Sequence, residues 1–320
     1  MSIGNPKQIP LFSTHYQGWE LASRGYAHER ISYRKKQQRK IVFHTLLHPR
    51  FAKKWFQLLH SSEHHYILSS RPRIYIKPFR VYLSTRWNPK RKQKVILDSY
   101  RFLETKGDLF QQFLSHPQGI TVARFTIDTA TECVLKLEYD DRFRKEGEFV
   151  LTLESEQLGG KIVSVSFAVE ENSKGHWYCY IGCVQGHPDP QAWEHFKFIQ
   201  KAMFGLRPNS FVVNVLQDLI RQLGCETIYC TGDSIQANRK KHAIHLPGIH
   251  DISFNYNKFW LEMEAEDVGS GWFRLPLIPA RKEMSEIKSQ KRSMYRKRYA
   301  LLDGISQKIS ETVQSFTSNT

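Results

Sequence analysis

Apolar residues recur at steps of three and four in the first third of the chain, and this spacing predicts amphipathic helices. Residues 28–60 follow it, with a break expected at Pro49 because proline disrupts a helix interior. The apolar positions of that segment are Phe43, Leu46, Leu47, Phe51, Trp55, Leu58 and Leu59. Residues 89–114 repeat the pattern, and Gly107 predicts two short helices there. Residues 71–87 carry two prolines and short aromatic runs, which indicate an extended docking segment.

From about residue 116 the pattern changes to that of strands, which alternate in polarity or run apolar between short turns. The predicted strands are 120–128, 132–139, 148–154, 161–170 and 176–184. Their connections are short, so we expect an antiparallel meander.

Helical periodicity returns after the meander. Residues 190–205 and 209–224 predict two helices, and residues 225–232 predict a strand. This strand should join the sheet in parallel, because helices separate it from the meander. The remaining predicted segments are 254–264, 271–277 and a long helix over 280–313.

Together these elements predict an α/β (α+β) fold with a mostly antiparallel sheet, a helical N-terminal region and a long C-terminal helix. We expect three parts: a basic helical region (1–115), an α/β core domain (116–280) and a basic C-terminal helix packed on the core (281–320). At 320 residues and 40% hydrophobic, the chain can bury a substantial core.

The formal net charge of +16 is unevenly distributed. Residues 1–106 hold 22 Lys/Arg and 5 Asp/Glu, residues 107–280 hold 16 and 22, and residues 281–320 hold 9 and 4, which gives +17, −6 and +5. Basic surfaces attract phosphates, whether of nucleic acid, of anionic lipid head groups or of a phosphorylated ligand. Charge alone leaves the choice among these partners open.

The start of the chain lacks the features of a secretory signal, and no window approaches the roughly 18 apolar residues of a membrane span. We therefore expect a cytoplasmic protein, with peripheral contact at the inner membrane left open. Five cysteines without an export signal predict free thiols. Cys179 and Cys183 lie near His187 and His195, but their spacing favours core cysteines over a zinc site, and we expect no metal.

Gln185 and Gly186 end the last strand of the meander, directly before a helix. A turn of this kind can present backbone amides to a phosphate, or it can simply connect the two elements. We favour the connecting turn, because the chain has no GxGxxG or GxxxxGK[ST] motif.

The entrance of the second helix, GLRPNS (205–210), is better suited to an anion. It combines Gly205, the permanently charged Arg207 and a choice of Asn209 or Ser210 as N-cap, with Gly224 expected at the helix end. A bound anion would meet both the helix N-terminus and the guanidinium. An ordinary helix corner with a surface arginine explains the same residues equally well.

Two further polar groups have competing interpretations. Asp233 and the histidines His242, His245 and His250 occupy a loop at a sheet end, where functional residues often lie, but we favour a solvated loop. The run 291–303 places five basic residues among two tyrosines, Tyr295 and Tyr299. It is either a nucleic-acid-binding face or a packing stripe, and the acidic middle of the chain favours packing.

Several short motifs occur in an order that resembles the VirK/YbjX family of Gram-negative bacteria. They are KPFRVYLS (77–84), SYRFLE (99–104), QG (185–186), GLRP (205–208), the step from Gly224 to Tyr229, NYNKFW (255–260), RLP (274–276) and KRSMYRKRYALLD (291–303). The resemblance covers about residues 40 to 305. It implies a role in envelope remodelling, in virulence through surface display of a virulence factor, and in tolerance of cationic antimicrobial peptides. The family resemblance supplies no reaction, so no catalytic residue is carried over.

The order of elements is also similar to the acyltransferase fold of the GNAT type. That fold has an antiparallel meander, a turn and helix that bind pyrophosphate, and then a parallel strand. The resemblance implies an acyl carrier wedged between splayed strands, here 176–184 and 225–230. This chain departs from the pattern by an extra helix at 190–204 and by the missing Q/R-x-x-G-x-G/A turn, for which GLRPNS would substitute.

We therefore hypothesise a VirK/YbjX-like cytosolic protein that transfers an acyl or aminoacyl group from acyl-CoA or another phosphate-bearing carrier. The expected carrier-binding residues are Gln185, Gly186, Gly205, Arg207, Asn209 and Ser210. The residues expected near the acceptor, as catalytic candidates, are Asp233, Tyr256 and Trp260. The alternative is a non-enzymatic protein whose basic ends bind tRNA, other RNA or anionic lipid, and which affects expression or delivery of envelope proteins.

Overall fold

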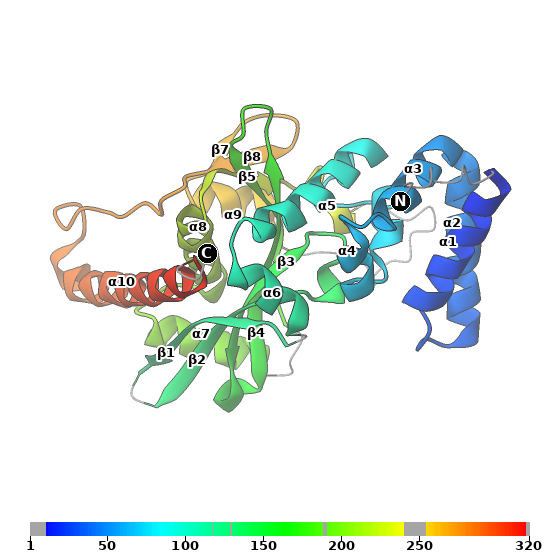
Figure 1. Cartoon of the computed structure of the whole chain (residues 1–320). Helices are drawn as coiled ribbons and strands as arrows, with labels where there is room; N and C mark the ends of the chain where they lie inside the picture. The colour runs from blue at the N-terminus through cyan, green and yellow to red at the C-terminus, as the bar shows by residue number, and fades with distance from the viewer. Residues whose placement is uncertain (1–10, 117, 129, 188–190, 240–253, 318–320) are drawn as a thin grey trace. The chain divides into compact units, whose positions relative to one another are not determined.

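The computed structural model describes residues 11–116, 118–128, 130–187, 191–239 and 254–317 (Figure 1). Contacts divide the chain into two units, residues 1–81 with 88–93 and residues 82–87 with 94–320. The predicted domain limits stay a prediction. By contacts, the helices directly before residue 115 belong with the sheet.

The first unit is helical, as the apolar spacing predicts. Its elements are α1 (Leu11–Gly25), α2 (Ile31–Leu47), α3 (Pro49–Leu59), α4 (His65–Ser70) and the 3-10 helix η1 (Ile74–Phe79). Pro49 is the first residue of α3, so the predicted break is confirmed. The extended conformation predicted for 71–87 is wrong over η1, whose six residues are all buried. Burial against other helices, with the Trp55 indole donating to the Tyr75 carbonyl oxygen at 2.9 Å, stabilises this short helix.

The second unit contains an eight-stranded sheet in the order β1-β2-β3-β4-β5-β6-β8-β7 among the described residues. The strands are β1 (Ile120–Ile127), β2 (Thr131–Glu138), β3 (Phe149–Ser155), β4 (Gly160–Glu171), β5 (Trp177–Gly186), β6 (Cys225–Thr231), β7 (Glu266–Asp267) and β8 (Trp272–Leu275). Among these described strands, β5 and β6 pair in parallel and the other neighbours are antiparallel. The predicted fold class, the antiparallel meander and the parallel strand that follows it are confirmed.

Helices of the same unit pack on this sheet. They are α5 (Pro89–Glu104, within the unit from Lys94 on), α6 (Asp108–Ser115), α7 (Ala192–Ala202), α8 (Pro208–Gln222), α9 (Tyr256–Glu262) and α10 (Ser289–Thr317), with short 3-10 helices η2 (Asp141–Phe143), η3 (Glu156–Leu158) and η4 (Ala237–Arg239). The two-helix interpretation of 89–114 is confirmed, since Gly107 separates α5 from α6. Helix α8 packs on strands β3 to β6, and the long red helix α10 packs on α8 and β1 (Figure 1). All five cysteines are buried free thiols.

Two helix boundaries differ from the prediction. Helix α8 begins at Pro208, so its N-cap is Arg207 and not Asn209 or Ser210. The reason is that proline suits the first helical position, where no intrahelical N–H bond is needed. The predicted end is confirmed, because Gly224 adopts a left-handed φ of +91° directly after the helix. Helix α10 begins at Ser289, later than the predicted residue 280.

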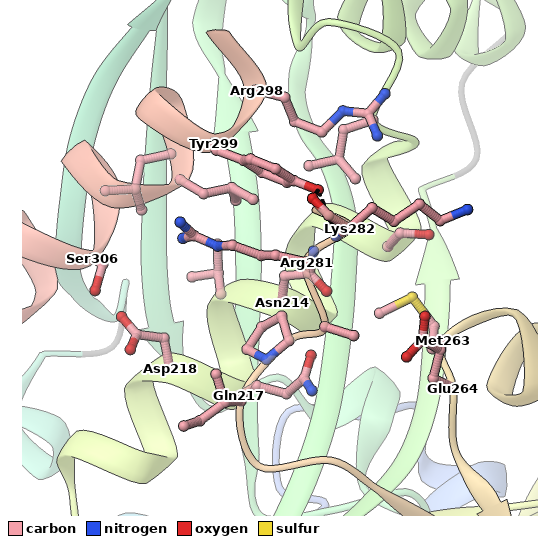
Figure 2. A pocket seen from close by; sticks show the side chains of 18 of the residues that line it. Asn214, Gln217, Asp218, Met263, Glu264, Arg281, Lys282, Arg298, Tyr299 and Ser306 are labelled. Atoms are coloured by element: carbon pink, nitrogen blue, oxygen red, sulfur yellow. Dashed lines mark hydrogen bonds between the residues drawn. The ribbon is translucent and has the colours of Figure 1, made fainter. Parts of the chain in front are cut away.

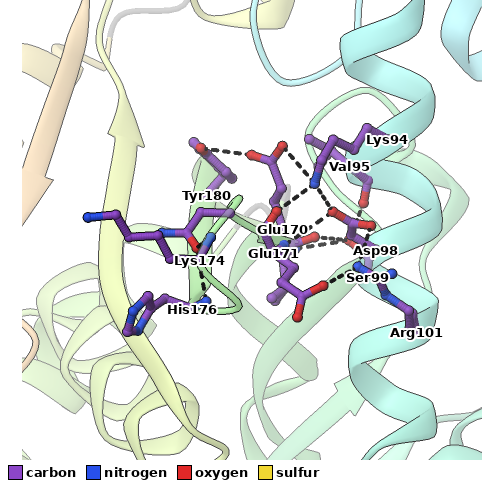
Figure 3. A network of polar contacts seen from close by, with 12 residues as sticks. Lys94, Val95, Asp98, Ser99, Arg101, Glu170, Glu171, Lys174, His176 and Tyr180 are labelled. Atoms are coloured by element: carbon purple, nitrogen blue, oxygen red, sulfur yellow. Dashed lines mark hydrogen bonds and ion pairs between the residues drawn. The ribbon is translucent and has the colours of Figure 1, made fainter.

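A polar network joins α5 to the end of β4 (Figure 3). The Ser99 hydroxyl accepts a hydrogen bond from the Val169 amide at 2.9 Å, and the Asp98 carboxylate accepts one from the Glu171 amide at 3.2 Å. The Lys94 ammonium lies 3.4 Å from the buried Glu170 carboxylate. These bonds satisfy strand-edge backbone groups, and they fix α5 against the sheet.

Candidate functional site

A pocket of about 760 Å³ lies among α8, α10, the end of α9 and residues 278–282 (Figure 2). This volume is in the range of small-molecule sites in proteins. Polar and apolar side chains line it together. They include Ser210, Asn214 and Gln217 of α8, Met263 and Glu264 after α9, and Tyr295, Arg298, Tyr299 and Leu302 of α10.

Two amide side chains on α8 give the pocket unused hydrogen-bond acceptors. The Oδ1 atom of Asn214 and the Oε1 atom of Gln217 are buried, and neither has a hydrogen-bond partner among the described residues. The Nε2 atom of Gln217 donates to the Pro276 carbonyl oxygen at 2.6 Å, which fixes the orientation of this amide. Gln217 is only 1% exposed. A buried acceptor without a donor is costly, so these oxygens would gain from a ligand that carries N–H or O–H groups.

The α10 wall is built from two tyrosines four residues apart, each contacted by a cation. The Tyr295 and Tyr299 rings meet edge to face, with centroids 5.9 Å apart. The Arg298 guanidinium lies 4.3 Å from the Tyr295 ring centroid and donates to the Phe204 carbonyl oxygen at 2.7 Å. The Tyr299 hydroxyl accepts a hydrogen bond from the Lys282 amide at 2.9 Å. Both tyrosines of the run 291–303 thus serve packing and the pocket.

Most of the pocket's charges are already paired within the chain. Arg221 contacts Asp218 at 2.5 Å, and the Arg281 guanidinium contacts Asp303 at 2.5 Å. Among the lining residues, the Lys282 ammonium, the Arg298 guanidinium and the Glu264 carboxylate have no ion pair within the described part of the chain. These three charged groups and the floor amides can therefore contribute polar contacts to a ligand.

The predicted anion-binding stretch borders this pocket. Leu206 and Ser210 line it, and Gly205, with φ +80°, faces the guanidinium of Arg298. Arg207 sits at the rim, where it pairs with Glu262 at 2.8 Å and is 62% exposed. The carrier-binding roles of these residues stay a prediction.

Asn209 belongs to the same stretch, in the first turn of α8. Its Oδ1 atom is buried without a hydrogen-bond partner among the described residues, like the two amide oxygens of the pocket floor. Asn209 itself is absent from the pocket lining, so this acceptor is not one of the pocket's polar groups.

The predicted residues Gln185 and Gly186 do not line this pocket. Gln185 pairs with Ser164 in the sheet, and a Cβ added at Gly186 would lie 3.2 Å from the ring of Phe196 on α7. The geometry is that of a turn which lets α7 approach the sheet closely. Of the two stretches expected to bind the carrier, only GLRPNS borders the pocket.

The next residue, His187, anchors this turn through both ring nitrogens. Its Nε2 atom lies 2.9 Å from the Ser164 hydroxyl, and its Nδ1 atom lies 3.2 Å from a guanidinium nitrogen of Arg142. Burial, followed by the charges of Arg142 and Lys161, lowers the pKa of His187 to about 4. A neutral imidazole can accept the arginine N–H at Nδ1 and donate from Nε2. The turn after β5 is thus held in place by side-chain bonds.

The three catalytic candidates lie together around α9. Asp233 accepts hydrogen bonds from the amides of Tyr256 and Asn257, at 3.0 and 3.3 Å, and so caps this helix. Tyr256 and Trp260 are buried, with 3% and 0% of their surface exposed. Their hydrogen-bonding groups contact backbone carbonyl oxygens of β5 and β6. These contacts are structural, and a catalytic role for the three residues stays a prediction.

The α9 side chains lie where β5 and β6 cease to pair. The last pair in the parallel register is Ile181 with Cys230. Beyond it, the Tyr256 hydroxyl donates to the Val184 carbonyl oxygen at 3.2 Å, and the Trp260 indole donates to the Thr231 carbonyl oxygen at 2.9 Å. The space between the strands, where the GNAT resemblance implies a carrier, is bridged by the chain's own side chains.

Sequence reasoning missed two features of the second unit. Asn214 and Gln217 share one side of α8 with Ser210, Asp218 and Arg221, so their spacing is that of an ordinary polar helix face and gives no separate signal. Glu146 lies in a turn before β3 with 1% of its surface exposed, and burial raises its pKa to about 7. No periodicity marks that turn. His242, His245 and His250 lie outside the described residues.

The described residues hold neither a cluster of metal ligands nor a membrane-spanning helix. No group of three or more His, Cys, Asp or Glu side chains there is arranged to hold a metal ion. No helix in the same part of the chain has the length and hydropathy that a bilayer span requires.

Comparison with known proteins identifies relatives along most of the chain. The family described as "Protein of unknown function (DUF535)" matches residues 30–311. The "Uncharacterized protein YbjX" of Escherichia coli K12 is 25% identical over 276 residues, which is 85% of this chain and 82% of the relative. An uncharacterized protein of Haemophilus influenzae is 32% identical over 220 residues, or 68% and 70% of the two chains. The resemblance to the VirK/YbjX family is thereby confirmed.

One solved structure resembles the chain distantly. It is a mutant of a cAMP-binding acyltransferase from Mycobacterium smegmatis, with a TM-score of 0.30 and 11% sequence identity. The match covers 69% of this chain and 60% of that chain.

Proposed function

The chain belongs to the DUF535 family of proteins of unknown function, and we propose that its pocket binds a phosphate-bearing acyl carrier of the phosphopantetheine type. The observation that supports this proposal is the pair of buried amide oxygens on the pocket floor, Asn214 Oδ1 and Gln217 Oε1, which have no donor in the described chain. A pantetheine arm carries amide N–H groups along an otherwise apolar chain. Such an arm offers donors to both oxygens and methylene groups to the apolar lining.

The remaining lining fits the two ends of such a carrier. Lys282 lies exposed at the pocket with no ion pair among the described residues, so its ammonium is available to a phosphate. Met263, Ile278 and Leu302 supply apolar surface for an acyl chain. A small free anion would use the basic side chains alone and would leave the floor amides unsatisfied.

We extend the proposal to acyl or aminoacyl transfer. An acceptor amine would attack the carrier's thioester or ester carbon, a C–N bond would form, and the C–S or C–O bond would break. The amine proton would pass to a carboxylate and then to the leaving thiolate or alkoxide. Glu264 suits the role of proton acceptor, because it is the lining carboxylate without an ion pair in the described residues.

The VirK/YbjX resemblance suggests an acceptor that belongs to the bacterial envelope or to its precursors. Virulence and resistance to antimicrobial peptides would then follow from modification of the cell surface. This biological role is part of the proposal and depends on the ligand.

A thermal-shift screen with CoA, long-chain acyl-CoA, pantetheine, charged tRNA and unrelated RNA tests carrier binding. The variant Asn214→Leu removes an unpaired buried acceptor and keeps the number and branching of the side-chain heavy atoms. It should stabilise the ligand-free protein by about 1 kcal/mol and abolish the shift given by acyl-CoA. Gln200→Leu on the exposed surface of α7 is the matched control and should retain the shift. Absence of a shift with every carrier, or a full shift in Asn214→Leu, would refute the proposal.

Arg207→Ala probes the rim of the same pocket. Removal of the guanidinium leaves the Glu262 carboxylate unpaired among the lining residues, so phosphate should bind more weakly. Both side chains are exposed, so stability should change by less than about 0.5 kcal/mol. Affinity for acyl-CoA that is unaffected by this variant would exclude the predicted carrier role of Arg207.

A further inference from the structure

Helix α2 of the first unit exposes apolar and basic side chains on the same face. Positions 32, 36, 39, 43 and 47 are spaced by three or four residues and therefore lie on one side of the helix. The apolar members of this region are large and exposed: Phe43 by 58%, Leu46 by 60% and Leu47 by 56%.

The opposite face of α2 is the one that packs inside the unit. Its buried residues are Gln37, Gln38, Ile41 and Thr45. Two of them make polar contacts there: the Gln38 amide donates to the Ser23 hydroxyl at 2.7 Å, and the Gln37 side chain accepts from Arg80. The helix is thus held by a largely polar face, while its aromatic and leucine side chains point away. Exposing the apolar face and burying the polar one loses hydrophobic stabilisation, so folding alone does not explain this arrangement of α2.

A shallow groove of about 460 Å³ runs along the exposed face. Ser32, Lys36, Arg39 and Phe43 line it, together with neighbouring side chains of the same helix. The groove is therefore mainly basic, through Lys36, Arg39 and Lys40, with the Phe43 ring beside these cations. We call the surface formed by Lys36, Arg39, Phe43, Leu46 and Leu47 the α2 surface.

The α2 surface has no acidic counterpart in its own unit. This unit, residues 1–81 and 88–93, contains 18 Lys/Arg and three acids, Glu20, Glu29 and Glu63. Each acid contacts a different group, at 3.5, 2.7 and 3.7 Å respectively. Lys36 and Arg39 have no ion pair among the described residues.

The positive field also acts on His44, which lies beside the groove. Its pKa is lowered to about 4, first by burial and then by the charges of Arg80, His48, Lys40 and Lys92.

Cations without ion pairs beside exposed apolar side chains suit the surface of an anionic membrane, where charged head groups lie next to apolar acyl chains. Lys36 and Arg39 can meet lipid phosphates, while Phe43, Leu46 and Leu47 enter the boundary between head groups and acyl chains. RNA could bind the two cations and stack a base on Phe43, but it has no apolar region in which Leu46 and Leu47 could be buried. The apolar exposure therefore favours lipid over nucleic acid.

We propose that the α2 surface docks the protein onto anionic lipid membranes, with Lys36 and Arg39 on head-group phosphates and with Phe43, Leu46 and Leu47 inserted at the interface. The docked helix lies in the plane of the membrane and does not cross it. This inference is independent of the pocket ligand.

Co-sedimentation of the full chain with vesicles tests the charge component. Vesicles of phosphatidylglycerol and phosphatidylethanolamine should bind the protein, and vesicles of phosphatidylcholine alone should not. Lys36→Glu with Arg39→Glu should weaken binding by roughly tenfold or more. Lys174→Glu with Lys258→Glu makes the same change in net charge at two other exposed lysines and should retain most of the binding. If both double variants lost vesicle binding equally, net charge alone would explain the binding, and docking through the α2 surface would be overturned.

Insertion is tested by a probe on α2. All five native cysteines are buried, so Leu46→Cys can be labelled selectively with an environment-sensitive fluorophore. Its emission should shift to the blue on addition of anionic vesicles, whereas a label at Leu261→Cys, 59% exposed elsewhere, should not respond. Phe43→Ser with Leu47→Ser should reduce vesicle binding, in contrast to Leu261→Ser with Val268→Ser. An unchanged spectrum, unchanged binding of Phe43→Ser with Leu47→Ser, or RNA binding without vesicle binding would each overturn the proposal.

Discussion

The Tyr256 hydroxyl donates a hydrogen bond to the carbonyl oxygen of Val184, at 3.2 Å, just beyond the point where β5 stops pairing with β6. A buried backbone carbonyl oxygen that has no partner on the neighbouring strand needs another hydrogen-bond donor. Here the chain provides that donor from α9, whose N-terminus is in turn capped by Asp233. The space between diverging strands is therefore part of the core, and the accessible pocket lies between α8 and α10.

Tyr256→Phe should lower the free energy of unfolding by about 1–3 kcal/mol, because the buried Val184 carbonyl oxygen loses its donor. Chemical denaturation measures this loss. Tyr229→Phe, at a half-buried tyrosine of β6, is the matched control and should change stability much less. The acyl-CoA shift should survive in Tyr256→Phe. Its loss in a folded variant would instead show that Tyr256 contributes to the carrier site.

Much of the fold could be predicted because the deciding signals are local. Pro49 and Gly107 separate helices through their own backbone preferences, and short polar turns define the meander. The 3-10 helix η1 could not be predicted in the same way, because it depends on burial of all six of its residues against distant segments. The N-cap of α8 was misplaced because the preference of Pro208 for the first helical position outweighs the capping tendency of Asn209.

The site was harder to predict than the fold. The stretch 205–210 was singled out from its charge and its helix start, and two of its residues line the pocket. The floor amides were missed, because a side chain without a hydrogen-bond partner is recognised only when all its neighbours are known. Gln217 is an example: its Nε2 atom is satisfied by Pro276, 59 positions away, while its Oε1 atom is not.

Glu146 should make stability depend on pH in an unusual direction. Burial raises its pKa from 4.5 to about 7, so between these values the folded protein keeps a proton that the unfolded chain loses. Its contribution to stability should therefore fall as pH rises from about 4.5 to 7, by roughly 3 kcal/mol. Glu146→Gln keeps an oxygen for Asn238 and should remove this slope in denaturation curves. Identical slopes in the variant and the wild type would show that Glu146 does not titrate in this window.

His187 should act in the opposite direction. Its pKa is lowered from 6.5 to about 4, so the unfolded chain binds a proton in this range before the folded protein does. The contribution of His187 to the free energy of unfolding is complete above pH 6.5 and should be lost as pH falls towards 4. His187→Gln should flatten this acid limb, while His116→Gln, at an exposed histidine, should not. Because Glu146 and His187 oppose each other in overlapping windows, each effect is measured as a difference between variant and wild type.

Gly205 couples backbone conformation to the pocket wall. Its φ of +80° disfavours any side chain, and a Cβ there would lie 3.0 Å from the Nη2 atom of Arg298. Gly205→Ala should therefore cost about 1–2 kcal/mol and displace Arg298 from the Phe204 carbonyl oxygen, which weakens ligand binding at that wall. Gly269→Ala is the matched control, since Gly269 has a similar φ of +83° with open space around its Cβ position. Denaturation should show similar losses for both variants, whereas titration with acyl-CoA should show weaker binding only for Gly205→Ala. If Gly205→Ala and Gly269→Ala bound acyl-CoA with equal affinity, the position of Arg298 would not affect ligand binding. The carrier would then bind elsewhere in the pocket.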